Sequence, residues 1–161
     1  MSDTLVRLEH FIAQWRTPLE SGAEVFFKAR AHQGVAAGAP TQIANSFVSE
    51  CGFAAIGHQW EMLDPTARAE EPRSAIGAFQ DALSRDLAMR TDWLGTECAA
   101  RCGAQFVDAF EPTWATIVTN HIARDGGQSE GWNPISTSAL EWAFVGFDRD
   151  AIALLLLTGE D

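Results

Sequence analysis

The chain begins with apolar residues that recur every three or four positions, which is the spacing of one helix face. They are Leu5, Leu8, Phe11, Ile12 and Trp15. Ser2 or Asp3 can cap the start of this helix, and Thr17-Pro18 is expected to end it, because proline disfavours helical geometry in the residue before it. The pattern predicts an N-terminal helix with one apolar face.

Similar spacing continues along the chain and predicts further helices over residues 21–32, 41–63, 74–110 and 113–123. A helix over 74–110 would be longer than is usual in a globular protein, so a break near 91–95 is the alternative.

The C-terminal segment is open to two interpretations. Ser138-Ala-Leu-Glu141 matches a capping box and favours a helix over 139–158. The alternative is a hairpin whose strands are 142–147 and 151–157. Leucine and alanine outnumber β-branched residues here, so the helix is favoured.

These patterns together predict an all-α protein, a helical bundle of about five to six helices with one long helix. Residues 34–40 are interpreted as a linker and residues 125–134 as a polar loop. We expect a single domain, in which residues 1–127 form the bundle and residues 128–161 pack on it as a loop and C-terminal segment.

Charge narrows the range of partners. The 161 residues carry a formal charge of −11, and Lys28 is the only lysine. Such a surface repels phosphate backbones and anionic lipid headgroups, so a nucleic-acid partner is not expected. A basic protein or an apolar polymer surface remains.

The compartment follows from cysteine usage and hydropathy. Three cysteines are an odd number and a low density, which is typical of a reducing compartment. No basic segment followed by an apolar stretch opens the chain. The longest strongly apolar run, Ala151–Leu157, spans about 10 Å as a helix, far less than a bilayer core. We expect a cytoplasmic protein with no transmembrane span.

Catalytic motifs are missing from the sequence. No histidine follows a carboxylate at the Glu-x-x-His spacing of bundle metal sites, and there is no phosphate-binding glycine loop or Gly-x-Ser-x-Gly elbow. The sequence therefore predicts no catalytic residue, no metal site and no cofactor, although an enzyme of another type stays open.

Cysteine and histidine spacing suggests two weaker possibilities. Cys98 and Cys102 would share one helix face, where they could form a redox pair or bind a soft metal, but packing in the core is the favoured interpretation. Cys51 and His58 would also share a face as a nucleophile pair, and a core role is again favoured.

Aromatic residues supply candidates for a binding surface and for a pocket. Tryptophans often mark partner surfaces, and the candidates are Trp93, Trp132 and Trp60, although anchoring of loops is the favoured alternative. A pocket between helices would be lined by Phe47, Cys51, His58, Phe79 and Leu83.

Residues 41–112 resemble the helical core of phasins, small cytoplasmic proteins associated with polyhydroxyalkanoate granules. The likeness lies in residues 45–51, 59–63, 79–85 and 97–110, with Pro72 and with Glu111-Pro112 after the last segment. The resemblance implies a helical amphiphile that coats an apolar polymer surface, with self-association as an option. It implies no catalytic residue.

Three functions follow as hypotheses. The first is a non-catalytic acidic scaffold, in its most concrete form a phasin-like granule coat. The second is an acidic inhibitor or immunity-type protein that neutralises a basic partner, such as a nuclease, with strong dependence on salt. The third is a helical pocket for a small apolar ligand or cofactor.

Overall fold

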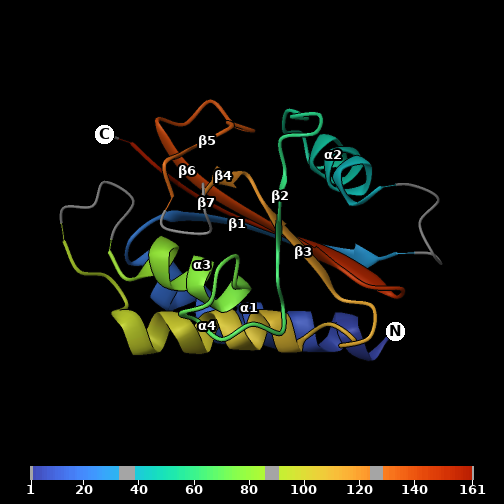
Figure 1. Cartoon of the computed structure of the whole chain (residues 1–161), viewed down its shortest axis with the longest axis horizontal. Coiled ribbons are helices and arrows are strands. Elements are labelled where there is room, and N and C mark those ends of the chain that lie inside the picture. The colour runs from blue at the N-terminus through green and yellow to red at the C-terminus, as the bar shows by residue number, and fades with distance from the viewer. Residues whose placement is uncertain (1, 33–38, 86–90, 124–128, 161) are drawn as a thin grey trace.

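A five-stranded antiparallel sheet with helices on both faces organises the protein (Figure 1). The structure, a computed structural model, describes residues 2–32, 39–85, 91–123 and 129–160. The helices are α1 (Asp3–Glu20), α2 (Pro40–Glu50), α3 (Ala75–Leu83) and α4 (Thr96–Asp108). The strands are β1 (Glu24–Ala31), β2 (Glu61–Leu63), β3 (Thr116–Thr119), β4 (His121–Ile122), β5 (Gly131–Trp132), β6 (Leu140–Phe147) and β7 (Ala151–Gly159). The strand order of the large sheet is β1-β7-β6-β3-β2, and β4 pairs with β5 in a separate ribbon.

The sheet separates two hydrophobic clusters. Helices α1, α3 and α4 cover one face, where Phe79 stacks on Phe144 with ring centroids 4.0 Å apart. Helix α2 covers part of the other face, where Phe47 packs with Trp60 and Val145. Side chains alternate between these faces along each strand, as a pleated strand requires.

The prediction of an all-α helical bundle is wrong, and the largest error lies at the C-terminus. Residues 139–158 form no helix. Strands β6 and β7 make the hairpin that was the alternative, with Trp142 opposite Leu157 and Phe147 opposite Ile152. Both strands are buried on both faces over most of their length. Apolar residues and glycine therefore fill every position except Glu141 and Thr158, and the alternation that reveals a strand is missing. The Ser138–Glu141 capping box does not form either, and the hairpin belongs to the same sheet as the strands before residue 127.

Two further predicted helices are strands. The segment 21–32 forms β1, in which Val25 and Phe27 face one cluster and Phe26 faces the other. The segment 113–123 forms β3 and β4. Strand β1 pairs with β7, and β3 pairs with β6. This pairing overrides the helical spacing of the two segments, because short apolar runs produce such spacing easily.

Other helical predictions are confirmed in part. Helix α1 starts where expected, with the Ser2 hydroxyl accepting a hydrogen bond from the Leu5 N–H, but it continues through Pro18 to Glu20. The segment 41–63 is helical only to Glu50. The proposed helix over 74–110 is broken into α3 and α4.

Residues 34–38 of the predicted linker and residues 125–128 of the predicted polar loop lie outside the described residues. No helix in the described parts of the chain is both long enough and apolar enough to cross a bilayer.

Candidate functional site

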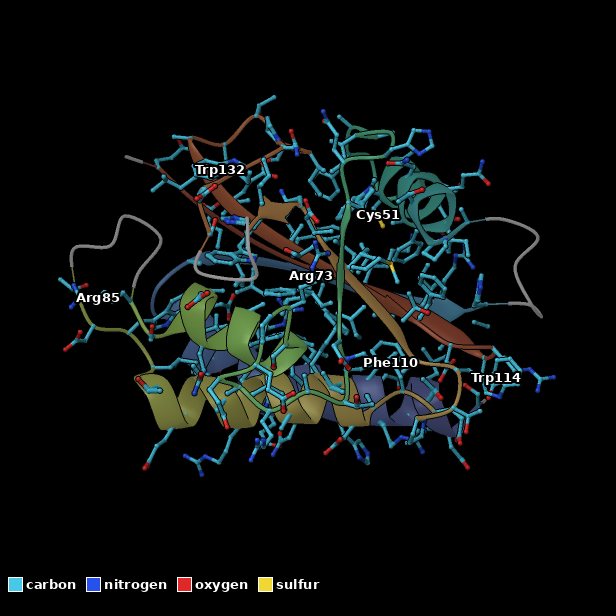
Figure 2. The ribbon with its side chains drawn as sticks, viewed as in Figure 1. Cys51, Arg73, Arg85, Phe110, Trp114 and Trp132 are labelled. Atoms are coloured by element: carbon cyan, nitrogen blue, oxygen red, sulfur yellow. The ribbon has the colours of Figure 1, made fainter. Side chains whose placement is uncertain are left out.

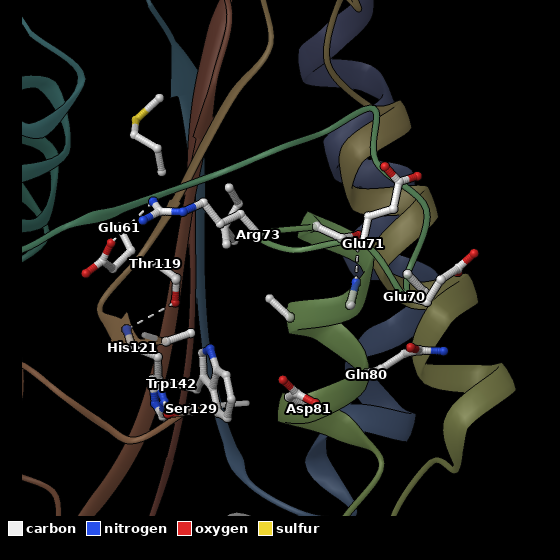
Figure 3. Close-up of a pocket in the computed structure, with 17 residues that line it drawn as sticks. Glu61, Glu70, Glu71, Arg73, Gln80, Asp81, Thr119, His121, Ser129 and Trp142 are labelled. Carbon is white, nitrogen blue, oxygen red and sulfur yellow. Dashed lines mark hydrogen bonds and ion pairs between the residues drawn. The ribbon is translucent and has the colours of Figure 1, made fainter. Parts of the chain in front are cut away.

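A pocket of about 220 Å³ opens between helix α3 and the adjoining part of the sheet (Figure 3). Thr119, His121 and Trp142 line it from the sheet side. Gln80 and Asp81 line it from α3. The two walls come from distant parts of the chain, so the pocket exists only in the folded protein.

The loop before α3 is held in place by its own hydrogen bonds. The Asp64 N–H donates to the Arg73 carbonyl at 2.6 Å, and the Ala75 N–H donates to the Asp64 carbonyl at 3.0 Å. The buried Ser74 hydroxyl caps α3 by accepting from the Gly77 N–H at 3.0 Å. These bonds fix the first turn of α3, and with it the pocket wall.

Arg73 adopts a backbone conformation that is unusual for its type. Its φ angle is +61°, in the left-handed region that favours glycine. Its guanidinium reaches across the pocket to Glu61, with Nη1 and Oε2 3.7 Å apart (Figure 3). Among the described residues that line the pocket, Arg73 is the only lysine or arginine.

His121 and Trp142 line the base of the pocket and belong to a stack of three aromatic rings, whose third ring, Trp132, lies outside the lining. The His121 imidazole lies 3.5 Å from the Trp142 ring with planes 7° apart, and Trp132 lies 5.4 Å away on the small ribbon. Hydrogen bonds hold the imidazole on both sides. Nε2 donates to the Glu141 carbonyl at 2.7 Å, and Nδ1 accepts from the Ser129 hydroxyl at 2.6 Å.

Burial lowers the pKa of His121 to about 4, and the hydrogen bond to the Glu141 carbonyl opposes this shift. The imidazole is therefore neutral at physiological pH. Since both ring nitrogens are already bonded, His121 positions the two tryptophans and offers no free nitrogen for proton transfer.

The Glu141 carboxylate holds the segments next to the aromatic stack together by hydrogen bonds. It is 2% exposed, and its two oxygens accept hydrogen bonds from the Asn120 amide, the Ile135 N–H and the Ser136 N–H and hydroxyl. A buried carboxylate needs such donors because burial without them is costly. Glu141 thus ties the loop around Ile135 to the strand that carries Trp142.

One polar atom at the base has no partner. Trp142 is 8% exposed, and its Nε1–H makes no hydrogen bond to any described residue. A buried donor without an acceptor costs about 1–3 kcal/mol.

The pocket is acidic. The described residues that line it include the acids Glu61, Glu70, Glu71 and Asp81 but only one cation, Arg73. Glu70 and Glu71 also form ion pairs with Arg68, which lies outside the pocket. The Arg68 Nε atom is 3.5 Å from Glu70 Oε1 and 3.2 Å from Glu71 Oε1. Asp81 has no hydrogen-bond or ion-pair partner among the described residues, and burial raises the pKa of its carboxyl group. The arrangement favours a positively charged occupant.

Among the described residues no cluster of three or more His, Cys, Asp or Glu side chains could hold a metal ion. The arrangement of donors and acceptors suits binding.

The five residues predicted to line a pocket lie on opposite faces of the sheet. Phe47 and Cys51 belong to the α2 side, whereas Phe79 and Leu83 are buried on the α3 side. His58 is exposed beyond the end of α2. The sheet between them prevents a common pocket, and the helix that would have joined Cys51 to His58 ends at Glu50.

The three tryptophans predicted to form a binding surface are anchored by packing. Trp60 is buried and donates to Asn45 at 2.8 Å. Trp93 is half-buried and donates to the Pro18 carbonyl at 3.1 Å. Trp132 is half-buried on His121. The exposed tryptophan is Trp114, at the opposite end of the molecule from Trp132 (Figure 2).

Cys98 and Cys102 share one face of α4, as their spacing predicts. Cys102 is buried beside Phe106, and burial raises the pKa of its thiol well above the ordinary range. A thiol that stays protonated is a poor metal ligand or nucleophile. Cys98 is half-buried at the edge of the same cluster.

Sequence reasoning missed Asp81, Arg73 and Trp142. Asp81 and Arg73 carry no motif. Trp142 was within a predicted helix, and its only sequence signal was the neighbouring Glu141, an acid inside an apolar run.

Comparisons with protein-family models, with curated proteins and with solved structures find no match for this chain. The pocket is therefore interpreted from its own chemistry.

Proposed function

We propose that this chain is a non-catalytic acidic protein that neutralises a basic protein partner, and that its pocket accepts a positively charged side chain of that partner. The observation that carries the proposal is the pocket itself, where four carboxylates face one guanidinium and Asp81 has no partner among the described residues.

The charge of the whole chain supports this proposal. A net charge of −11 attracts a basic partner over a distance and speeds association at low salt. A pocket that adds a specific site for one cation would convert this attraction into a defined orientation. None of the three cysteines is in a disulfide, which fits the reducing cytoplasm as the place of action.

The phasin-like hypothesis has less support from the geometry. Its helices would need apolar faces free to coat a polymer, but the apolar faces of α1, α3 and α4 are packed against the sheet. Within the described residues, the large apolar side chains classed as exposed are only Met62 and Trp114.

A small apolar ligand has one possible place. A hollow of about 540 Å³ on the other face of the sheet is lined in part by Phe26, Phe53 and Leu156. Among the described residues that line it, no side-chain polar atom is buried without a partner. Nothing there calls for a particular ligand, so we prefer the acidic pocket.

The test uses a defined probe. A capped pentapeptide with a central arginine, Ac-Gly-Gly-Arg-Gly-Gly-NH2, is titrated into isotopically labelled protein at low and high salt, and amide and indole N–H resonances are followed by NMR. The same peptide with citrulline keeps the shape of the side chain but removes its charge. We expect the arginine peptide to shift resonances of pocket residues and to bind more weakly at high salt.

Variants assign the binding to the pocket. Glu61→Gln and Asp81→Asn each remove one pocket charge and should weaken binding severalfold. Glu9→Gln makes the same change in charge on the exposed side of α1 and should leave binding unchanged. Equal binding of the citrulline peptide, or equal loss in all three variants, would contradict the proposal.

A further inference from the structure

The unpartnered indole of Trp142 restricts what the occupant can be. Its Nε1–H is a donor only, so it needs an acceptor. The described residues supply none, and Trp142 lines the pocket with 8% of its surface exposed. A native protein seldom leaves such a group unsatisfied without a reason.

Asp81, on the facing wall of the pocket, requires a hydrogen-bond donor from the occupant. It lies on α3 while Trp142 lies on β6, and Figure 3 shows the two side chains on facing sides of the pocket. As a carboxylate it accepts hydrogen bonds and cannot donate one. An occupant that satisfies both residues carries both an acceptor and a donor.

A basic side chain alone does not meet this requirement. Ammonium and guanidinium groups have donors but no acceptor. A peptide unit has both, since its carbonyl accepts and its N–H donates. Asn and Gln side chains also carry both groups, but a main-chain segment offers them at every residue, so we take it as the part of a protein partner that complements Trp142 and Asp81 together.

We propose that a main-chain segment of the partner enters the pocket, its carbonyl oxygen accepting from Trp142 Nε1–H and its N–H donating to Asp81, while a neighbouring basic side chain binds the outer carboxylates Glu61, Glu70 and Glu71. This inference rests on the proposed function and specifies its binding mode. Trp142 Nε1 is shielded from solvent in the free protein, so entry requires the side chains around it to shift slightly.

The test removes the two proposed hydrogen bonds one at a time. Trp142→Phe keeps an aromatic ring against His121 but removes the N–H. An ester bond in place of the N–H of the central arginine removes the peptide donor. Each change should weaken binding of the capped arginine peptide about tenfold, the effect of one hydrogen bond at a buried site. The dependence on salt should be unchanged, because no charge is altered.

The stability of the variant separates binding from a structural role. Trp142→Phe removes a buried unsatisfied donor, which offsets part of the cost of the smaller ring, so its melting temperature should change little while its affinity falls. Trp132→Phe is the matched control, because Trp132 belongs to the same aromatic stack but does not line the pocket. It should bind the peptide as the unchanged protein does.

The outcomes are distinguishable. Salt-dependent binding that Trp142→Phe and the ester leave intact would overturn this inference and keep the proposed function. Loss of binding together with a large fall in melting temperature would assign Trp142 a structural role and also overturn it. No salt-dependent binding of the arginine peptide to the unchanged protein would overturn both proposals.

Discussion

The Thr4 hydroxyl donates a hydrogen bond of 2.7 Å to the Asp148 carboxylate, which lies 144 positions further along the chain. The same carboxylate accepts from the backbone N–H groups of Glu111, Asp150 and Ala151. This carboxylate joins the start of α1, the segment after α4 and the β6–β7 turn, so it fixes the positions of these three elements relative to one another.

Asp148→Asn should therefore destabilise the protein by about 2–3 kcal/mol at neutral pH, because an amide cannot accept all four bonds. Burial alone would raise the pKa of Asp148, but the hydrogen bonds outweigh it and lower the pKa below its usual 3.8. The stabilisation is thus present above pH 3.8 and is lost as the pH falls through the lower folded value.

Urea unfolding at neutral and acid pH measures this effect. The difference between the unchanged protein and Asp148→Asn should narrow below pH 3.8. Asp150→Asn, at an exposed position in the same turn, is the control and should unfold as the unchanged protein does. Equal unfolding midpoints for Asp148→Asn and the unchanged protein at neutral pH would argue against the network.

His121 should make the stability of the protein depend on pH over a higher pH range than Asp148 does. Its pKa falls from 6.5 when unfolded to about 4 when folded, so stability is full above pH 6.5 and declines as the pH drops towards 4. His121→Gln should flatten this decline by removing the titrating group. His10→Gln, at an exposed position on α1, should leave the decline as it is. An NMR titration in which the His121 ring protonates near pH 6.5 would refute the prediction.

Lys28 should keep the long edge of the sheet from pairing with another chain. Strand β1 is paired only with β7, and its other edge is open among the described strands. The only lysine of the chain is exposed on this strand, and charged residues at strand edges oppose association. Lys28→Val should promote concentration-dependent dimers or aggregates, measured by light scattering. Lys28→Glu keeps a charge and should not, and dimers of both variants would count against this role.

Arg73 should oppose cation binding by occupying the acidic pocket itself. Arg73→Gly removes its guanidinium and also the strain of a φ angle of +61°. It should bind the arginine peptide more tightly than the unchanged protein. Arg73→Ala should bind equally tightly but unfold about 1 kcal/mol more easily than Arg73→Gly, since alanine keeps the strain. Peptide titration and urea unfolding measure the two effects. Unchanged affinity in both variants would show that Arg73 does not compete.

The sequence by itself determined the parts that depend on local chemistry. The amphipathic spacing of α1 and its Ser2 cap specify a helix from neighbours within one turn. Charge and composition likewise indicated an acidic protein with enough apolar residues for a core. The sequence indicated the hairpin of β6 and β7 only as an alternative, because strands covered on both faces show no alternation of apolar and polar residues.

The tertiary structure decided the sheet and the pocket. Which segments pair depends on contacts between distant residues, as between β1 and β7, and no local pattern encodes that choice. The pocket follows from the same pairing. Asp81 and Trp142 face each other only because α3 packs on the strand that carries the indole, and an unpaired donor becomes visible only once its surroundings are in place.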